Sequence, residues 1–395
     1  MAQGLEEGKS IYQGRSWLLR VNRAMKSAAV IVLEGKRDAN RYRIGLTNKE
    51  GLNVKRFSIS NGISPRQIAL LNENRLKQAK MITRVVQPFQ LQKALEHVIA
   101  NKGSAGVDGV SVGELRKVFS EKKLQLIEAI KQGNYQVRPI LGIEIPKGNG
   151  KTRLLGVPTT TERVLQQAVA QNLAPLFELE FSNYSYGFRP HKNARQAVGQ
   201  SREYIHQGLN HIVDIDLKNF FDEVDHCLLL NLIYQKVKCK ATMQLIRKWL
   251  RAPIKINGKL HKRRKGVPQG SPLSPLLSNI LLHQLDKEMT RRGHKFVRYA
   301  DDFSIYCKSQ NQAKATRVVI EKFLKNKLKL TINEEKSGIR KPINFTILGF
   351  GFVSTYEKGS KNQYQLIVSE KAWKKLKERL KTITRKTTPA TFEER

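Results

Sequence analysis

The stretch Arg298-Tyr299-Ala300-Asp301-Asp302-Phe303 places two adjacent carboxylates between segments rich in β-branched and aromatic residues. The flanks are His294-Lys295-Phe296-Val297 and Phe303-Ser304-Ile305-Tyr306-Cys307, a composition that favours two strands joined by a short turn. Two ionised carboxylates at the turn of an apolar hairpin are costly to desolvate and require a cation. A solvated acidic turn is the simpler alternative, and the surrounding chain has to decide between the two.

A second predicted strand also ends in an acid. The run from His211 to Leu217 alternates as a strand, and the chain turns into a helix from about Asp225. If this strand lies beside the hairpin, Asp216 comes close to Asp301 and Asp302. Like-charge repulsion opposes that arrangement unless Mg²⁺ is present. The pattern therefore predicts a site for two metal ions that supports nucleotidyl transfer.

The charge of the chain indicates what it binds. Its 395 residues contain 72 Lys and Arg against 33 Asp and Glu, a formal net charge of +39. A cationic field of this size favours a polyanionic partner, and nucleic acid is the commonest one. A basic membrane-binding protein is the rival, but the sequence shows no long apolar span and no leader. We expect no membrane association and a cytoplasmic location of bacterial or organellar type.

Apolar periodicity and turn residues predict the remaining elements. In chain order they are helices over 81–101 (with Phe89 among the apolar positions), 112–132 and 161–179, and a hairpin from Leu141 to Val157. They continue with β structure over 254–265, helices over 276–289 and 312–328, a strand pair within 345–353, and a Lys-rich helix over 370–385. Residues 1–80 are basic, with helix-like patterns around 17–25 and 28–33. We predict a helical N-terminal extension that lies on nucleic acid, with a solvated basic surface as the alternative.

The string Tyr299-Ala300-Asp301-Asp302 resembles the Y-x-D-D signature of reverse transcriptases. Further blocks, which follow in the same order as in that family, make the chain resemble the group II intron-encoded reverse transcriptases in particular. Those blocks are Gly103–Gly109, Ile145–Pro158, Tyr186–Pro190, Asp216–Asp222, Pro268–Asn279, Leu330–Ser337 and Leu348–Phe350. The resemblance covers about 81–353.

This resemblance implies an α+β fold, the right-hand polymerase architecture of fingers and palm, with an antiparallel palm sheet packed on helices. It divides the chain into the basic extension at 1–80, fingers with the first palm elements at 81–210 and the palm at 211–355. The start of a truncated thumb follows at 356–395. The implied activity is RNA-directed DNA synthesis with two Mg²⁺ ions, for which Mn²⁺ can substitute. The implied partners are a structured, intron-like RNA template, a DNA or RNA primer, and dNTPs.

The resemblance also implies roles for single residues. Asp216 and Asp301 correspond to ligands of both metals, Asp302 to a nearby and less essential acid, and the Leu217 carbonyl to a further ligand. Lys336 corresponds to a lysine proposed to protonate pyrophosphate, and Phe221 to the ring that excludes a ribose 2′-OH. The other implied contacts are Gln269, Gly270, Arg153, Lys151 and Lys147 to the incoming nucleotide, and Arg189, Tyr299, Lys374 and Lys375 to nucleic acid.

Two other functions compete with this reading. An RNA-binding maturase could stabilise folded intron RNA without using the polymerase site. An RNA-templated RNA polymerase is disfavoured by Phe221. Because only the first thumb helix is expected here, a second protein chain could supply the missing thumb and maturase functions.

Overall fold

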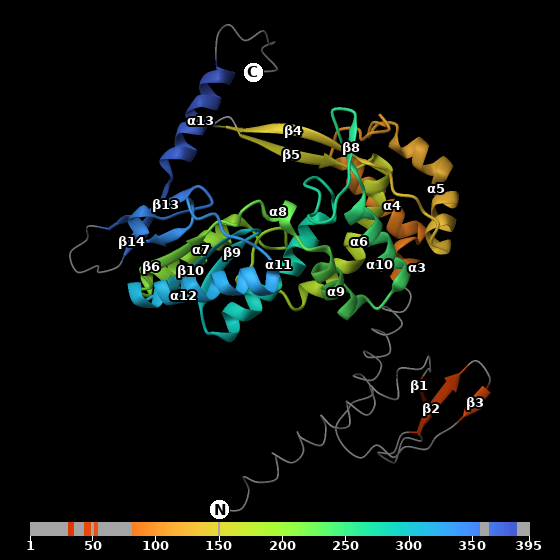
Figure 1. Cartoon of the computed structure of the whole chain (residues 1–395), viewed down its shortest axis with the longest axis horizontal. Helices are drawn as coiled ribbons and strands as arrows, with labels where there is room; N and C mark the ends of the chain where they lie inside the picture. The colour runs from red at the N-terminus through yellow and green to blue at the C-terminus, as the bar shows by residue number, and fades with distance from the viewer. Residues whose placement is uncertain are drawn as a thin grey trace, which may run out of the picture. The chain divides into compact units, whose positions relative to one another are not determined.

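The computed structural model of the chain describes residues 31–34, 43–48, 51–53, 81–148, 151–355 and 363–384. The chain divides into two compact units, Met1–Lys80 and Met81–Arg395, coloured from red to blue along the sequence in Figure 1. All the acids singled out above lie in the larger unit.

In the smaller unit, three short strands form an antiparallel sheet in the order β1-β2-β3. They are β1 (Ile31–Glu34), β2 (Arg43–Asn48) and β3 (Gly51–Asn53). The helix expected over 28–33 is therefore wrong at 31–33, within β1, where the β-branched Ile31 and Val32 favour an extended backbone that pairs with β2. The expected helix around 17–25 lies outside the described residues.

The central sheet of the larger unit joins the two acidic strands found in the sequence. Its strands are β6 (His211–Ile215), β9 (Lys295–Tyr299), β10 (Asp302–Cys307) and β11 (Gly338–Arg340). They run in the order β11-β6-β10-β9, and every neighbouring pair is antiparallel. Phe303 lies opposite Ile215 and Asp302 opposite Tyr299, so the hairpin and the strand before Asp216 lie side by side (Figure 1).

Helices cover both faces of this sheet. Val213 and Ile305 belong to one apolar core together with α11 (Ser274–Arg291) and α12 (Gln310–Phe323), which a π-helical turn, Leu324–Leu328, extends. Ile212 and Tyr306 face a second core with α7 (Ala194–His206). The predicted fold class, α+β with an antiparallel sheet packed on helices, is confirmed.

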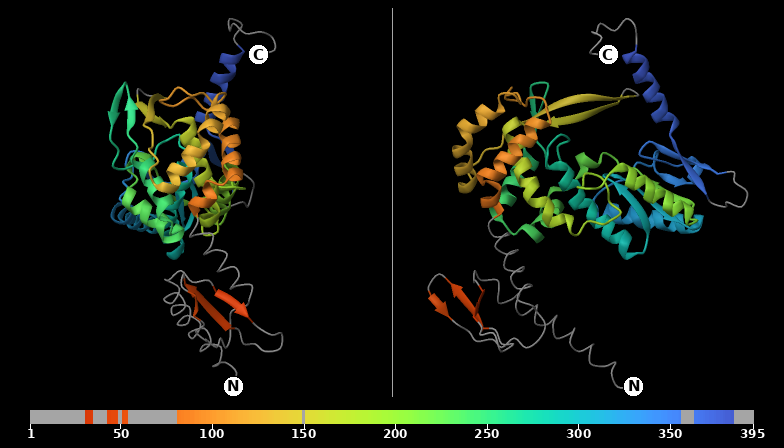
Figure 2. Two further views of the ribbon diagram at one scale, coloured as in Figure 1. Left: turned by 90° about the vertical axis from the view of Figure 1, so that its right-hand side faces the viewer. Right: turned by 180° about the vertical axis from the view of Figure 1, so that it is seen from behind.

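Among the described residues, four helices come before α7 in the chain, and a second, four-stranded sheet combines strands from before and after β6. The helices are α3 (Met81–Val85), α4 (Pro88–Ala100), α5 (Leu115–Gln132) and α6 (Thr160–Glu178). The strands β4 (Ile140–Gly148), β5 (Lys151–Val157), β7 (Ile254–Ile256) and β8 (Lys259–His261) are ordered β5-β4-β7-β8. The β4–β5 pair is the predicted hairpin, and Figure 2 shows it as a long yellow ribbon that projects from the helices.

The single helix expected over 81–101 is wrong, because the chain breaks it into α3 and α4. Pro88 stands at the first helical position of α4; it has no N–H to continue α3, and it disfavours helical backbone at the residue before it. Phe89, expected in the core, is 72% exposed as a consequence of this restart.

Three further helices follow the strand β6. They are α8 (Phe220–Glu223), α9 (His226–Val237) and α10 (Lys240–Arg251). The predicted start of α9 is confirmed, since the Asp225 carboxylate accepts a hydrogen bond from the Leu228 N–H at 2.8 Å and caps the helix. Neither α7 nor α10 is among the elements expected from the sequence.

The C-terminal part holds a small antiparallel sheet and one long helix. A 3₁₀ turn, Pro342–Asn344, precedes β12 (Thr346–Ile347), β13 (Phe350–Ser354), β14 (Tyr364–Val368) and α13 (Glu370–Ile383). None of the α13 residues is buried, and the helix stands clear of the sheet in Figure 2. The strand pair and the Lys-rich helix were expected, whereas β14 was not.

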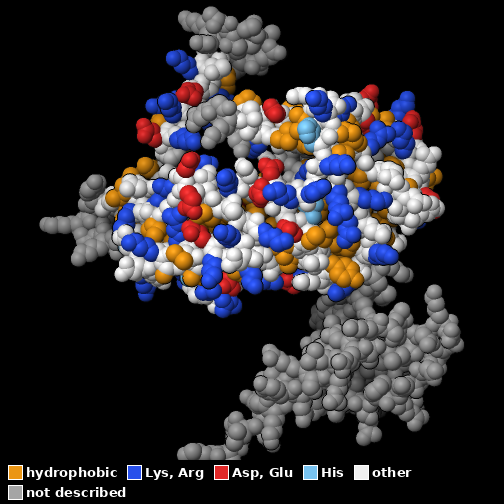
Figure 3. Space-filling model, in the orientation of Figure 1, with side chains coloured by type: hydrophobic (Ala, Val, Ile, Leu, Met, Phe, Trp, Pro, Cys, Tyr) orange, Lys and Arg blue, Asp and Glu red, His pale blue; other side chains and the backbone are white. Residues whose placement is uncertain are grey.

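Basic side chains are spread widely over the surface. Figure 3 shows blue Lys and Arg side chains over most of the visible face of the larger unit, with red acidic side chains among them, some beside a hollow near its centre. Within the described residues, no helix combines the length and the apolar character that a membrane span requires.

Candidate active site

The Asp301 carboxylate projects from a two-residue turn. Tyr299 pairs with Asp302 across the β9–β10 hairpin, so Ala300 and Asp301 form the loop between them. Ala300 has φ of 58°, a left-handed conformation that costs a residue with a β-carbon roughly 1–2 kcal/mol. Such a turn persists only where the surrounding structure fixes it.

A buried ionic cluster fixes this turn from behind. The Arg298 guanidinium is fully buried and pairs with both carboxylate oxygens of Asp286, at 2.7 and 2.6 Å. Its remaining nitrogen donates to the Asn279 side-chain oxygen at 2.9 Å and to the Ala300 carbonyl at 2.8 Å. We call Asn279, Asp286 and Arg298 the rear cluster; it holds the backbone of the turn that carries Asp301.

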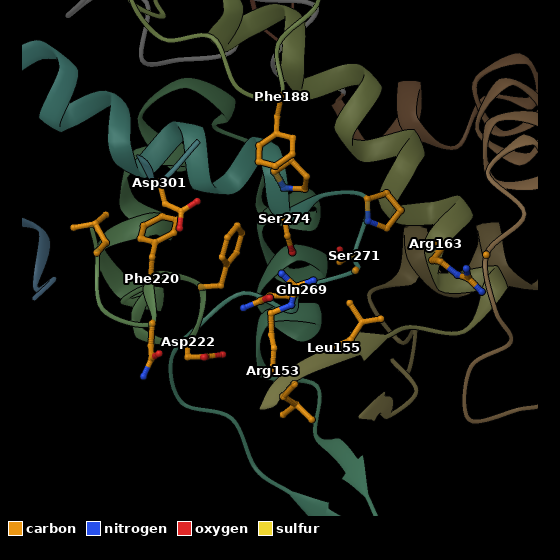
Figure 4. Close-up of a pocket in the computed structure, with 18 of the residues that line it drawn as sticks. Arg153, Leu155, Arg163, Phe188, Phe220, Asp222, Gln269, Ser271, Ser274 and Asp301 are labelled. Carbon is orange, nitrogen blue, oxygen red and sulfur yellow. The ribbon is translucent and has the colours of Figure 1, made fainter. Parts of the chain in front are cut away.

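Asp216 follows β6 and reaches the same pocket as Asp301. Its N–H donates to the Ser337 hydroxyl at 3.1 Å, and its carbonyl accepts from the Asn333 N–H at 2.8 Å. The Lys336 ammonium lies 3.4 Å from its carboxylate. Asp216 and Asp301, which we call the pocket carboxylates, line one cavity of about 1060 Å³, into which Asp301 points in Figure 4.

Asp302 is placed differently from Asp301. It does not line the cavity, and its side chain is exposed at the start of β10. Asp301 lies in the turn, whereas Asp302 is the first residue of β10, so the two side chains leave different parts of the backbone and only Asp301 lines the cavity. The structure therefore brings Asp216 and Asp301 together and leaves Asp302 at the margin.

The carboxylates influence one another electrostatically. Partial burial raises the pKa of Asp301, and the negative charge of Asp216 raises it further. Desolvation by the surrounding protein and then the charges of Asp301, Asp216 and Asp214 raise the pKa of Asp302 to about 6. Desolvation and the nearby like charges both favour the protonated form of these carboxyl groups.

The groups around Asp216 suit a magnesium ion better than a metal with an all-protein ligand cage. Among the described residues, no three His, Cys, Asp or Glu side chains gather closely enough to hold a metal. Mg²⁺ typically binds one or two carboxylates and takes its other ligands from water and substrate phosphates. The bridge between Leu217 and Ile332 uses the Asp216 carbonyl and the Lys218 N–H, so the Leu217 carbonyl takes no part in it. Two carboxylates and one carbonyl therefore fit the requirement.

Four of the predicted nucleotide contacts line the cavity. They are Arg153, Phe221, Gln269 and Gly270, and Figure 4 shows Arg153 and Gln269 facing the same space as Asp301. Phe220 lies next to Phe221, with ring centroids 5.3 Å apart, and is the more buried of the two. Lys147 and Lys151 lie in β4 and β5, but their side chains fall outside the described part.

The local structure requires glycine at position 270. The Gly156 N–H of β5 donates to the Gln269 carbonyl at 2.8 Å, and a β-carbon on Gly270 would lie 2.7 Å from the Gly156 oxygen. Gly270 also has φ of +118°, which disfavours any side chain. Glycine at position 270 thus allows the loop that contains Gln269 and Gly270 to approach β5 closely. This contact fixes Gln269 against the strand that carries Arg153.

The expected contact of Arg189 with nucleic acid is contradicted by its placement. Its guanidinium pairs with Glu178 at 2.6 Å, and the side chain is only 4% exposed. A further nitrogen donates to the Ser182 and Ser185 carbonyls. The cation is committed within the protein, because Glu178 at the end of α6 lies within its reach.

The other predicted nucleic-acid contacts have open positions. Tyr299 is half-buried at the end of β9, and Lys374 and Lys375 are exposed on α13. Sequence reasoning missed the rear cluster and Phe188, which lines the cavity. The acidic Asp286 within an apolar helix could have indicated a buried ion pair. The aromatic residue directly after Gly187 could have indicated an exposed ring.

Comparison with known proteins agrees with this geometry. Residues 145–352 match the family described as reverse transcriptase (RNA-dependent DNA polymerase). The group II intron-encoded protein LtrA of Lactococcus lactis subsp. cremoris is 32% identical, over 64% of this chain and 53% of that protein. Protein YkfC of Escherichia coli (strain K12) is 29% identical, over 67% of this chain and 80% of that protein.

The chain thus spans about half the length of LtrA. A chain of a solved partial Cas6-RT-Cas1–Cas2 complex is 23% identical with a TM-score of 0.39, over 72% of this chain and 47% of that one. The family match covers more than half of this chain and includes Asp216 and Asp301. The chain belongs to the reverse transcriptase family.

Proposed function

We propose that this chain is an RNA-directed DNA polymerase, which adds deoxynucleotides from dNTPs to a primer 3′-OH along an RNA template. One observation carries the proposal: Asp216 and Asp301, which lie at the ends of two adjacent antiparallel strands, line one cavity with the cations Arg153 and Lys336. A site that combines metal-binding acids with phosphate-binding cations suits a nucleoside triphosphate. The net charge of +39 supports a nucleic-acid substrate.

The metal requirement of the family is proposed to be met by two Mg²⁺ ions, with Mn²⁺ as a functional substitute. Asp216, Asp301 and the Leu217 carbonyl would hold them, and Asp302 would contribute less because it lies outside the cavity. When bound, such ions activate an attacking hydroxyl and neutralise a leaving pyrophosphate.

The chain's own side chains position the nucleotide. Arg153 is exposed on β5 and lines the cavity, and its planar guanidinium suits the oxygens of a triphosphate; Lys147 and Lys151 on the same hairpin would add charge. Gln269, fixed against β5, would contact the nucleotide. The half-buried Phe221 ring would press on the ribose and exclude a 2′-OH.

Lys336 is proposed to protonate the departing pyrophosphate. Its ammonium is well exposed and lies 3.4 Å from the Asp216 carboxylate, so a proton at Nζ is available beside the reacting phosphates. Glu334, which could have neutralised it, pairs with Arg317 instead.

The nucleic acid is proposed to lie between fingers (81–210) and palm (211–355), with 356–395 as the start of a thumb. An RNA template, structured and intron-like, and a DNA or RNA primer would be held mainly through their phosphates, with little base readout. Tyr299, Lys374 and Lys375 are candidate contacts. No observation on the cavity favours a maturase that leaves it unused.

Primer extension by the purified chain tests the proposal. Wild type should extend a DNA primer on an RNA template with dNTPs and Mg²⁺, and Asp301→Ala should abolish extension while leaving RNA affinity within about twofold, since one acid contributes little to phosphate contacts. Asp302→Ala is the matched control and should lose less. Extension by Asp301→Ala at the wild-type rate would refute the site, and absence of extension by wild type would refute the function.

A further inference from the structure

Phe188 is an exposed aromatic side chain in an unfavourable backbone conformation. It is 56% exposed and lines the same cavity as Asp216 and Asp301. Its φ of 58° lies in the left-handed region, where a bulky residue is rare and needs a structural or functional reason. Isolated exposed apolar residues are ordinary, but an exposed ring on strained backbone inside a functional cavity is not.

The residues before Phe188 are fastened to the palm. The Tyr186 N–H donates to the Arg298 carbonyl at 2.8 Å, and the Gly187 carbonyl accepts from the Asn279 amide at 2.9 Å. A β-carbon on Gly187 would lie 2.3 Å from the Ala300 nitrogen, so only glycine permits this contact. The turn that displays Phe188 therefore rests directly on the turn that carries Asp301.

The residue after Phe188 is fastened equally well. Arg189 pairs with Glu178 through two nitrogens, at 2.9 and 2.6 Å, and also holds the Ser185 carbonyl at 2.7 Å. Its guanidinium lies 5.4 Å from the centre of the Phe181 ring. With both neighbours fixed, the Phe188 ring is held in the cavity by rigid backbone, which is how a binding surface is preorganised.

The layout of the cavity indicates what the ring meets. In Figure 4, Phe188 and Arg153 lie on opposite walls, with Gln269 between them and Asp301 to one side. On the proposed function, the triphosphate occupies the wall with Arg153 and the primer end lies at the carboxylates. The wall with Phe188 then faces the template strand, which pairs with the primer end and with the incoming nucleotide.

We propose that Phe188 is a substrate-binding residue whose ring packs against a nucleotide of the template strand beside the nascent base pair. An aromatic face binds any base, so the contact adds affinity without sequence preference. The inference rests on the proposed function, since it takes a primed RNA as the ligand. It gives the strained turn a purpose: the ring is fixed at a constant position relative to Asp301.

Binding of a fluorescein-labelled DNA primer annealed to an RNA template, followed by anisotropy without dNTPs, tests the contact. Phe188→Ala should weaken binding about tenfold, as expected for the loss of one base–aromatic stack, while Phe188→Trp should stay within about twofold because it keeps an aromatic face. Phe188→Asn should weaken binding as much as Phe188→Ala, although asparagine favours the left-handed backbone. A deficit in both variants therefore arises from the missing ring, and not from a misfolded turn.

Phe89→Ala provides the matched control. Phe89 is also an exposed phenylalanine, at 72%, and it does not line the cavity, so its removal should leave affinity unchanged. Wild-type affinity in Phe188→Ala would overturn the inference. So would an increase in the KM for dNTP with unchanged affinity for the primed RNA, because the ring would then serve the incoming nucleotide.

Abasic sites placed one at a time in either strand locate the partner. An abasic template nucleotide next to the primer end should weaken binding to wild type and add no further loss in Phe188→Asn, the signature of a shared contact in a double-mutant cycle. Coupling to a primer nucleotide instead would refute the template assignment.

The proposed function and this inference fail separately. If wild type binds the primed RNA but incorporates no dNTP, the polymerase proposal fails while the affinity of the Phe188 variants still decides the contact. If wild type extends the primer and the Phe188 variants bind as well as wild type, only the contact fails.

Discussion

The rear cluster and the pocket carboxylates lie on either side of the turn that carries Asp301, and their charges have opposite environments. Behind the turn, Arg298 and Asp286 are both fully buried and bind each other through two hydrogen bonds. In front, no cation pairs with Asp301 in the part of the chain that the structure describes, and Asp216 has only the exposed Lys336. Charges that hold the fold are satisfied internally, whereas charges that face the cavity are left for a ligand.

The difference has an energetic consequence. A buried ion pair contributes little relative to an apolar replacement, but removal of one partner leaves an uncompensated charge in the interior. Removal of one of two like charges at a solvent-filled cavity relieves repulsion instead. Substitutions in the two groups should therefore change stability in opposite directions.

Arg298→Met should produce the largest loss of stability, about 3–5 kcal/mol, because it leaves the Asp286 carboxylate buried alone. Urea unfolding followed by circular dichroism measures the change. The double variant Arg298→Met with Asp286→Leu is the control and should recover most of the loss, since no charge then remains buried. A loss below about 1 kcal/mol in the single variant would show that water reaches the rear cluster.

His283, a buried histidine one helical turn before Asp286, can be used to measure how strongly this region is shielded from water. His283 is 6% exposed, and neither of its ring nitrogens has a hydrogen-bond partner among the residues that the structure describes. Its ring lies edge-on to Phe181, with ring centroids 5.4 Å apart. Burial lowers its pKa to about 4, although Asp286 and Glu180 oppose the shift while Lys287 and Arg298 assist it.

The folded protein should therefore lose stability as the pH falls from about 6.5 to about 4, by up to about 3 kcal/mol, because the unfolded chain binds the His283 proton first. Urea unfolding at several pH values measures this loss. His283→Leu should flatten the dependence in that window, whereas His261→Gln, on an exposed strand, should not. An unchanged profile in His283→Leu would contradict the assignment.

On the cavity side, Phe221→Ala tests whether the ring excludes ribose. The variant should raise kcat/KM for rNTPs relative to dNTPs by roughly 10–100-fold, the scale on which a shaped pocket discriminates such groups. Single-nucleotide incorporation on a primed RNA template measures the ratio. Phe220→Leu is the control, because Phe220 is the more buried ring; a larger effect there would move the role to Phe220.

Much of this arrangement follows from local sequence patterns. Alternation identified β6 and the β9–β10 hairpin, and acids at the ends of two strands were sufficient to anticipate that Asp216 and Asp301 would meet. Pro88 marks a helix break that a stricter reading of the rule for the residue before proline would have found. The strand Ile31–Glu34 could likewise have been predicted from its β-branched residues.

What local patterns could not supply was the direction of long polar side chains. Arg189 faces the interior because it pairs with Glu178, which lies eleven residues earlier in the chain, at the end of α6. The rear cluster likewise joins α11 to β9, and the exposure of Phe188 depends on contacts of Gly187 with Ala300. These are tertiary contacts, which composition and spacing do not encode.

The smallest expected effect is on stability at the cavity itself. In a buffer with a chelator, Asp301→Asn should leave the free energy of unfolding unchanged or raise it by less than about 1 kcal/mol, because it removes one of two repelling carboxylates. Urea unfolding beside the rear-cluster variants measures it under identical conditions. Asp225→Asn is a matched control in which the acid is paired, with Lys329 at 2.6 Å, and there stability should not rise. A clear loss in Asp301→Asn would mean that Asp301 also holds the turn, and the division between front and rear charges would no longer stand.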